Sequence, residues 1–364
     1  MFLIFLLITV LLMSYVSIAW TCLNTPFLSF NLTAKIAPAL LTLFLLAAFI
    51  IPHQVYNNFS YALQVAGHIL LGLLFLYFLT VMAAMALQLL FKLTGHPLKI
   101  PLGVFVMIIA FIISAKGAYN AFKQPAIVNI TVNTDVPGTD GIKIVHLSDT
   151  HFGGTVTPSR VAKLTKQINE LEPDFIFFTG DIFEYAGRYA PLFIENVKNM
   201  HAKLGKYGVP GNHEYYSGVN ANMDMYRAAG IIPLQNKTAY VGKINIVGVN
   251  DIVTSGIKPH YFEQIIRNGT VFNSNYNILL SHTPLYLEEA ANNKIGLMLS
   301  GHTHNGQIWP FKYLTALKFP YINGLYTKDK TNLYVSSGTF YWGPPFRLGT
   351  INELPVIILK EAQQ

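Results

Sequence analysis

The feature that most constrains this chain is the absence of acidic residues from its first third. No Asp or Glu precedes Asp135 in the 364-residue sequence, and the segment before it consists largely of long apolar runs. Such segments, with apolar runs of about 20 residues, are typical of membrane-spanning helices. Across the chain 52% of residues are hydrophobic and only 12% are charged. Soluble domains usually have about 25% charged residues, so a wholly soluble protein is excluded.

Four apolar runs predict about four membrane helices, which together form a predicted transmembrane domain over residues 1–124. The runs cover residues 2–20, 36–51, 67–91 and 100–115. The second and fourth runs are shorter than the roughly 20 residues that cross a bilayer. A re-entrant or buried helix therefore stays open as the alternative for each of these two.

The lysines near these runs bear on orientation. Four spans would place both chain ends on one side of the membrane. Lys35, Lys92 and Lys99 would then lie on the side of the membrane opposite the part of the chain that follows residue 124. Lys116 and Lys123 would lie on the same side as that part. Cytoplasmic loops carry the excess of Lys and Arg. Three lysines against two favour an extracytoplasmic domain in a multi-pass protein of the cell membrane, whereas the α-amino group, if it is counted, restores a tie.

The net charge of +7 does not indicate a nucleic-acid partner. Five of the positive charges are lysines of residues 1–124, and residues 125–364 hold 20 basic against 18 acidic residues. A domain that binds nucleic acid usually carries a strongly basic stripe or patch, so we expect no such partner. The single cysteine, Cys22, excludes a disulfide within the chain and a cysteine-based zinc finger.

From about residue 125 the pattern changes to short apolar strands that alternate with helices. The predicted strands cover residues 142–147, 174–179, 207–209, 238–240, 244–249, 277–280, 297–299, 333–336 and 355–359. The predicted helices cover residues 157–171, 191–204, 218–229, 259–267 and 284–291. Such alternation predicts an α/β fold with both faces of a central sheet covered. We therefore expect a second domain over residues 125–364.

Five polar clusters follow the carboxyl ends of predicted strands, where open α/β sheets place their sites. They are Ser148-Asp149-Thr150-His151, Thr179-Gly180-Asp181, Pro210-Gly211-Asn212-His213-Glu214, Ser281-His282-Thr283-Pro284 and Ser300-Gly301-His302-Thr303-His304. A mixed set of His, Asp and Asn ligands suits Mn, Fe or Zn. Two such ions about 3.5–4 Å apart need about as many ligands as these clusters hold.

In chain order the clusters read D-x-H, G-D, G-N-H-[DE], H and G-H-x-H. This set is similar to that of the calcineurin-like metallophosphoesterase superfamily over residues of about 140–360. The segments GHTHNGQIWP and SSGTFYWGPPFRLG resemble its membrane-anchored bacterial YkuE/YaeI-type branch. The resemblance implies a four-layer α/β/β/α sandwich with two divalent or trivalent transition-metal ions (Mn, Fe or Zn).

The resemblance also implies a role for each motif residue. The metal ligands would be Asp149, His151 and His304 for one ion, Asn212, His282 and His302 for the other, and Asp181 as the bridge between them. His213 would be catalytic without holding metal: it would protonate or stabilise the leaving oxygen while a metal-activated hydroxide attacks phosphorus.

Some positions depart from the family pattern or stay open. Glu214 stands where Asp is more common, and Thr150 where an aliphatic residue is usual, but neither is a ligand position. Trp309, Trp342 and Arg347 either line a substrate rim, with Arg347 as a phosphate fork, or have structural roles.

The function expected from the sequence is a membrane-anchored, binuclear metal-dependent phosphoesterase. Its expected partners are a phosphoester substrate and membrane lipid. A narrower alternative is a lipid-linked phosphate or pyrophosphate substrate, such as a phospholipid or a UDP-diacylglucosamine. An alternative from another class is a non-catalytic membrane scaffold that uses the metal fold. Loss of His213 or Asp181 would favour the scaffold, but both residues are present.

Overall fold

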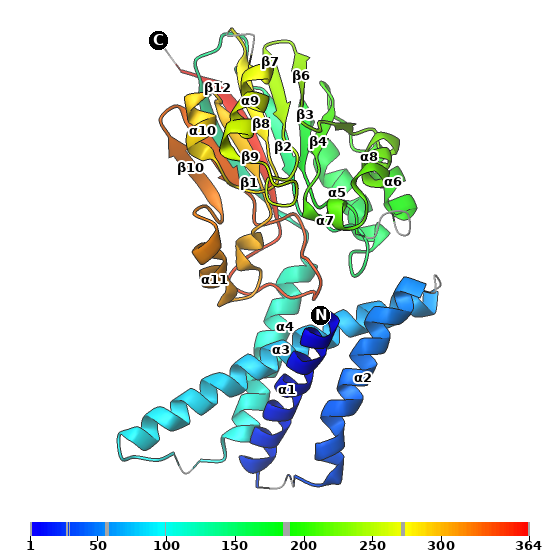
Figure 1. The fold of residues 1–364 in the computed structure, drawn as a ribbon, viewed down its shortest axis with the longest axis vertical. Helices are drawn as coiled ribbons and strands as arrows, with labels where there is room; N and C mark the ends of the chain where they lie inside the picture. The colour runs from blue at the N-terminus through cyan, green and yellow to red at the C-terminus, as the bar shows by residue number, and fades with distance from the viewer. Residues whose placement is uncertain are drawn as a thin grey trace. The chain divides into compact units, whose positions relative to one another are not determined.

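The structure is a computed structural model that describes residues 2–26, 28, 30–54, 58–98, 100–184, 190–270 and 274–362. The chain divides into two compact units (Figure 1). The first, here called the helical unit, contains Met1–Tyr119 together with Gly343–Phe346. The second, the sandwich unit, contains Asn120–Trp342 and Arg347–Gln364. Each unit is described by itself below.

The helical unit is built on long apolar helices. They are α1 (Phe2–Leu23), α2 (Leu32–Gln54), α3 (Asn58–Leu93) and α4 (Leu102–Phe122). Among the described residues, Ala34–Ile51, Phe59–Leu93 and Leu102–Phe122 are long and apolar enough to cross a membrane, and α1 adds the shorter apolar stretch Leu7–Leu23. The second and fourth runs, which looked short, thus belong to helices of 23 and 21 residues.

Two helices extend beyond the apolar runs of the sequence. The second run ends at residue 51 and the third begins at residue 67, but α2 continues to Gln54 and α3 begins at Asn58. The apolar run that begins at Gly67 is preceded by helix formers such as Ala62, Leu63 and Gln64, and helix propensity does not require an apolar side chain. Residues 55–57 lie outside the described residues.

Small apolar clusters hold the four helices together. Val10, Leu45 and Leu74 join α1, α2 and α3, and a second cluster around Trp20, Val81 and Val106 joins α1, α3 and α4. Three polar side chains of this unit form a chain of hydrogen bonds between α1 and α3. The indole N–H of Trp20 donates to Gln88 Oε1 at 3.1 Å, and Gln88 Nε2 donates to Asn24 Oδ1 at 2.7 Å.

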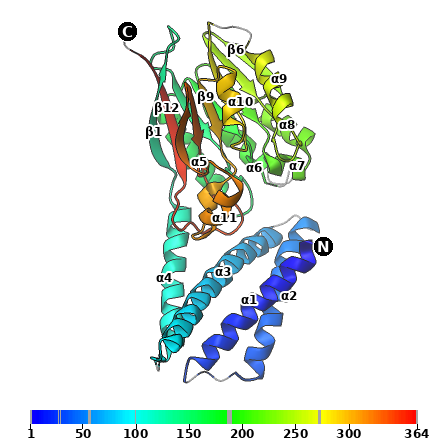
Figure 2. The ribbon, with the colours of Figure 1, turned by 60° about the vertical axis from the view of Figure 1, so that its left-hand side comes forward.

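Two six-stranded sheets form the centre of the sandwich unit (Figures 1 and 2). The first has the order β1-β12-β2-β3-β4-β5, and the second β10-β11-β9-β8-β7-β6. The strands of the first sheet are β1 (Ala126–Thr134), β2 (Lys143–Leu147), β3 (Phe175–Thr179), β4 (Lys206–Val209), β5 (Ile232–Pro233) and β12 (Glu353–Glu361). Those of the second are β6 (Lys237–Val241), β7 (Ile244–Gly248), β8 (Tyr276–Leu280), β9 (Leu297–Ser300), β10 (Gly324–Lys328) and β11 (Thr331–Val335).

The inner faces of the two sheets pack on each other. Ile144, Phe177 and Val209 of the first sheet share one buried cluster with Ile246 and Leu299 of the second. The alternation of elements predicted one central sheet, whereas the structure has two, because an alternating pattern does not reveal where one sheet ends and the next begins.

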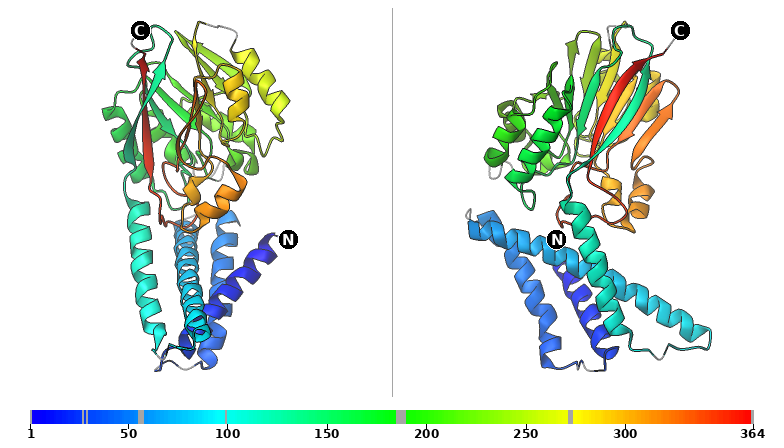
Figure 3. Two further views of the ribbon diagram at one scale, coloured as in Figure 1. Left: turned by 90° about the vertical axis from the view of Figure 1, so that its left-hand side faces the viewer. Right: turned by 180° about the vertical axis from the view of Figure 1, so that it is seen from behind.

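Helices cover the outer faces of both sheets (Figure 3). They are α5 (Pro158–Glu170), α6 (Ala190–Lys198) and α8 (Val219–Ala228) on the first sheet, and α9 (Pro259–Gly269) and α10 (Leu287–Asn292) on the second. Phe262 and Ile266 of α9 and Leu287 of α10 pack on the second sheet. The expected four-layer α/β/β/α sandwich is therefore confirmed. Three short helices, α7 (Asn212–Tyr216), η1 (His304–Gly306) and α11 (Phe311–Lys318), lie outside these layers.

Candidate metal centre

All five polar clusters follow strands at the carboxyl ends, as the sequence predicts. Asp149 and Asp181 follow β2 and β3, Asn212 begins α7 after β4, and His282 and His302 follow β8 and β9. Strands β2, β3 and β4 are parallel to one another, and so are β8 and β9. Parallel strands bring their carboxyl ends to one edge of a sheet, so these side chains meet at one edge of the sandwich.

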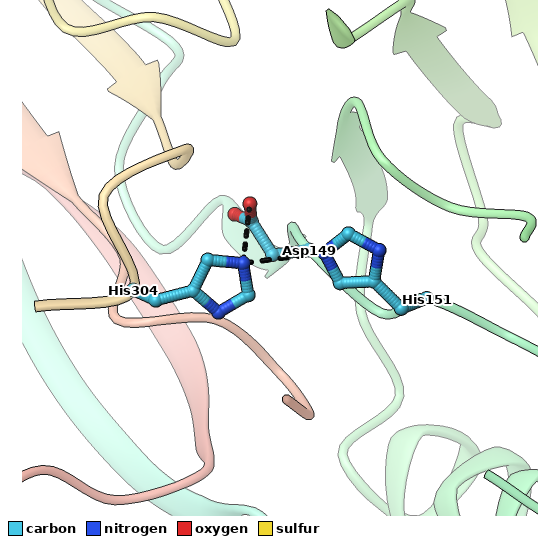
Figure 4. A group of neighbouring side chains, drawn as sticks. All are labelled: Asp149, His151 and His304. Carbon is cyan, nitrogen blue, oxygen red and sulfur yellow. Dashed lines mark hydrogen bonds and ion pairs between the residues drawn. The ribbon is translucent and has the colours of Figure 1, made fainter. Parts of the chain in front are cut away.

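Asp149, His151 and His304 form the first group of ligand-type side chains (Figure 4). His304 Nε2 lies 3.3 Å from Asp149 Oδ1 and 3.2 Å from His151 Nε2. His151 Nδ1 donates to Glu184 Oε1 at 2.5 Å, which leaves the lone pair of its Nε2 facing the other two side chains. A converging carboxylate oxygen and imidazole lone pairs fit a transition-metal cation.

Asn212, His282 and His302 form the second group. Asn212 Oδ1 lies 3.1 Å from His282 Nε2 and 2.9 Å from His302 Nδ1, and the two ring nitrogens are 3.2 Å apart. His282 Nδ1 donates to the carbonyl of Thr179 at 2.7 Å, which orients the ring so that its Nε2 points toward the amide oxygen. This donor set also fits a cation.

Asp181 lies between the two groups. Its Oδ2 is 3.3 Å from His282 Nε2 and 4.0 Å from His151 Nε2. Its Oδ1 accepts the backbone N–H of His213 at 2.9 Å, which fixes the orientation of the carboxylate. The position between the two groups fits the bridging role that the family resemblance implies.

The electrostatics of the cluster also fit cations. Asp149 and Asp181 are both buried. Burial alone would raise their pKa values, but the facing histidines, chiefly His304 and His282, outweigh it and hold both pKa values below the usual range. Burial and the neighbouring His282 lower the pKa of His302 to about 4. At neutral pH the cluster therefore offers two carboxylates and a neutral imidazole as ligands.

The backbone at these positions is unusual. Five of the predicted ligands have a left-handed backbone conformation: Asp149 (φ 52°), His151 (φ 43°), Asp181 (φ 55°), His302 (φ 72°) and His304 (φ 48°). Such conformations cost about 1–3 kcal/mol each outside glycine and gather at functional sites. Hydrogen bonds between the loops hold them: the N–H of Asp149 donates to Gly180 O at 3.1 Å, and that of His151 to Asp181 O at 3.0 Å.

Two glycines let the loops approach closely. Gly180 has φ 88°, and a side chain there would overlap the backbone of Gly211. A side chain at Gly301 would overlap Ser148 and the carboxylate of Asp149.

His213 lies beside the two ligand groups. Its Nε2 is 3.9 Å from Asp181 Oδ2, and its Nδ1 is 3.4 Å from Glu184 Oε1. Burial disfavours the charged imidazolium, but Asp181 and Glu184 outweigh this and raise the pKa of His213 to about 9. A ring that is protonated at neutral pH is suited to donate a proton.

Glu184 is a site residue that the sequence reasoning missed. Its Oε1 accepts from His151 and faces His213, so one carboxylate orients both rings. The three residues also lie close enough to form a third group of ligand type, but hydrogen bonding accounts for their geometry. The available signal was the spacing Gly180-Asp181-x-x-Glu184, which places a carboxylate three residues beyond the proposed bridge.

We expect Glu184→Gln to affect both rings. Loss of an outer partner of a metal-bound histidine typically costs 10–100-fold in metal affinity or activity. Removal of one of the carboxylates that raise the pKa of His213 should also move the basic limb of the pH–rate profile to lower pH. Metal titration and pH–rate profiles check both effects. Glu170→Gln, on the exposed surface of α5, is the matched control, and an unmoved basic limb in Glu184→Gln would contradict the assignment.

The two residues that depart from the family pattern, Glu214 and Thr150, have structural roles. Glu214 is fully buried, and its carboxylate accepts the backbone N–H groups of Gly211, Asp181 and Ile182 at 2.7–2.8 Å. The hydroxyl of Thr150 donates to the carbonyl of Ile182 at 2.8 Å. Both residues thus fasten the loop that carries Asp181.

Arg347 is a buried side chain and does not line an exposed substrate rim. It is fully buried, and its guanidinium donates to Ser337 O at 2.8 Å and to Thr350 Oγ1 at 3.1 Å. The structure therefore supports the structural alternative for Arg347. Trp309 and Trp342 are exposed instead, by 57% and 53%.

The fold and the site together define an α/β/β/α sandwich protein with a candidate metal centre at its strand ends. The calcineurin-like phosphoesterase family matches residues 142–306. An uncharacterised metallophosphoesterase of Helicobacter pylori is 30% identical over 68% of this chain and 68% of its own length. The chain belongs to the calcineurin-like metallophosphoesterase family.

Two further relatives identify the branch. A transmembrane protein with a metallophosphoesterase domain from Danio rerio is 31% identical over 71% of this chain and 63% of its own length. The uncharacterised metallophosphoesterase YkuE of Bacillus subtilis is 29% identical over 71% of this chain and 95% of its own length. These relatives and the apolar helices confirm the membrane-anchored branch. The chain covers 62–65% of the length of the Danio rerio protein and of two further relatives, from Campylobacter jejuni and Bos taurus.

Proposed function

We propose that this chain is a membrane-anchored phosphoesterase with a binuclear metal centre. The observation that carries the proposal is the convergence of Asp149, Asp181 and five further ligand-type side chains from five strand ends, with His213 beside them. Mn, Fe or Zn ions suit this donor set. When bound, two such ions would neutralise charge on the phosphoryl oxygens and lower the pKa of a coordinated water.

The side chains of the protein would divide the remaining work. Asp149, His151 and His304 would hold one ion, and Asn212, His282 and His302 the other, with Asp181 shared. His213 would donate its proton to the leaving oxygen, and Glu184 would hold the His213 ring in place. Phe319 and Trp342 contact His302 and His213 and would limit the access of water to the two rings.

The non-catalytic scaffold remains the alternative from another class. It requires only that the fold bind metal, so it would not need a protonated histidine beside the ligands. The measurement that separates the two is hydrolysis of nitrophenyl phosphate and bis(nitrophenyl) phosphate by the purified full chain. We expect hydrolysis of at least one ester that is lost with chelator and restored by Mn²⁺. A chain that binds metal but hydrolyses neither ester would support the scaffold.

We further propose that residues 1–124 act as a multi-pass membrane domain and residues 125–364 as the phosphoesterase domain. The apolar helices of this region, which contains no carboxylate, support the proposal. We expect the full chain to stay in the membrane pellet after high-salt and alkaline carbonate washes. Recovery of intact protein in the carbonate supernatant would contradict this.

The lysine distribution supports an extracytoplasmic phosphoesterase domain. Two reporters fused after Gln364, one active only outside the cytoplasm and one active only inside it, test on which side of the membrane this domain lies. Activity of the cytoplasmic reporter alone would overturn it.

A further inference from the structure

The sandwich unit carries an exposed apolar surface around α11. Trp309, Phe311, Tyr313, Leu314 and Leu317 are all exposed, Leu317 by 85%. No side chain of α11, all of which the structure describes, is buried. With Trp342, these residues are called the α11 surface below. Contiguous exposed apolar patches on a domain mark sites of interaction with proteins, ligands or membranes.

The charges on this surface are positive. Residues 309–319 contain Lys312 and Lys318 but no Asp or Glu. Lys312 and Lys318 lie on α11 itself, each close to a neighbouring aromatic ring. Phe, Tyr, Leu and Lys on one short helix, with Trp309 shortly before it, are typical of elements that lie in the interfacial region of a membrane. Lysines there favour anionic lipid headgroups.

The α11 surface adjoins the candidate metal centre. The turn η1 contains His304, and Gln307 follows it directly. The side chain of Gln307 donates to Trp342 O and accepts the Trp342 N–H, both at 2.9 Å. The Trp342 ring lies edge-on to the ring of His213, with centroids 5.8 Å apart. The exposed surface therefore begins beside the proposed catalytic histidine.

The same surface connects to the end of an apolar helix within the sandwich unit. Asn120, in the last turn of α4, donates to Arg347 O at 3.1 Å. The next residue, Leu348, accepts the backbone N–H of Trp309 at 2.9 Å. Asn352 fastens this helix end by donating to Ala121 O at 2.7 Å. Two hydrogen bonds, from Asn120 to Arg347 and from Trp309 to Leu348, thus link the end of the apolar stretch Leu102–Phe122 to Trp309.

We propose that the α11 surface lies in the headgroup region of the membrane and that the metal centre acts on a phosphate ester carried by a lipid headgroup. Hydrolysis would break one P–O bond of the headgroup; water would supply the hydroxyl to phosphorus, and a proton would go to the leaving oxygen. The substrate class rests on the proposed function. The membrane contact rests on the exposed residues, their charge and the end of α4.

The three tryptophans of the chain, Trp20, Trp309 and Trp342, allow a direct test of the contact. Two variants keep one surface tryptophan each: Trp20→Phe/Trp342→Phe keeps Trp309, and Trp20→Phe/Trp309→Phe keeps Trp342. The full chain is placed in vesicles of phosphatidylcholine and phosphatidylglycerol with brominated acyl chains. We expect these lipids to quench both tryptophans and aqueous acrylamide to quench them weakly.

Tyr240→Trp, in a chain that also carries Trp20→Phe, Trp309→Phe and Trp342→Phe, is the matched control. Tyr240 is exposed and pairs with Asn245 near the amino end of β7, opposite the strand ends that carry the site. We expect acrylamide, and not brominated lipid, to quench it. The same result for Trp309 and Trp342 would overturn the membrane contact and indicate a surface that faces water or another protein.

The substrate class has its own test, with Leu314→Glu/Leu317→Glu in the full chain. Both side chains are exposed, so folding should be retained. We expect hydrolysis of phosphatidic acid or phosphatidylglycerol in vesicles to fall by about tenfold or more, while hydrolysis of soluble nitrophenyl esters is unchanged. No selective loss on the lipid esters would overturn the lipid substrate. If the parent chain hydrolyses no ester at all, the proposed function fails, whereas the quenching result still decides the membrane contact.

Discussion

Asp181→Asn should lose both metal and activity. The substitution keeps the size of the side chain and an oxygen that can accept the N–H of His213, but it removes the negative charge between the two ligand groups. Loss of an outer partner alone costs about 10–100-fold in metal affinity, so loss of a shared ligand should cost at least about 100-fold. Metal titration of the purified full chain, with activity measured in parallel, checks this.

Asp224→Asn is the control for this variant. Asp224 lies exposed on α8 and pairs with Arg227, so its substitution should change neither metal content nor activity. If Asp181→Asn still binds two ions with unchanged affinity, Asp181 is not the bridging ligand.

His213→Ala should fail in a different way. Because His213 lies beside the ligand groups and is protonated at neutral pH, its loss should remove a general acid and leave the metal in place. General acids contribute about 10²–10⁴-fold to turnover, and we expect a loss in that range with unchanged metal content. His201→Ala, an exposed histidine after α6, is the control and should behave like the parent chain.

The leaving group separates proton donation from phosphate positioning. A nitrophenolate leaves with little protonation, whereas an alkoxide needs a proton as the bond breaks. His213→Ala should therefore lose less activity on a nitrophenyl ester than on an alkyl ester. An equal loss on both esters would mean that His213 positions the phosphate, and a loss of metal would mean that it is a ligand.

The elements with strong local signals could be predicted from the sequence. The helix α5 begins with Pro158 and buries Val161, Leu164 and Ile168, a spacing that is readable without the structure. The five strand ends that carry the site could be read in the same way, because each joins an apolar run to a polar cluster. The four-layer arrangement came from the family resemblance.

The elements that the sequence did not reveal depend on distant or missing partners. The strand β1 pairs with β12, more than 200 residues later, and β10 is an edge strand. The helix α11 has no buried stripe, so it lacks the periodic apolar pattern by which a helix is recognised. Helix α10 begins at Leu287, later than predicted, because Tyr286 has a left-handed φ of 65°.

Within the site, the sequence identified residues but not the contacts between them. It placed His151 and His213 in separate clusters, and only the folded chain shows that Glu184 lies between their Nδ1 atoms. Likewise, the sequence could not show which nitrogen of His302 faces the second group; the structure turns Nδ1 toward Asn212. The ligand roles themselves stay predictions.

The central claim is that the seven proposed ligands hold two ions. Elemental analysis of the full chain, purified without chelator and reconstituted with Mn²⁺, measures this most directly. The arrangement of two ligand groups with Asp181 between them predicts two ions per chain. A content of one ion or none after reconstitution would contradict the binuclear centre.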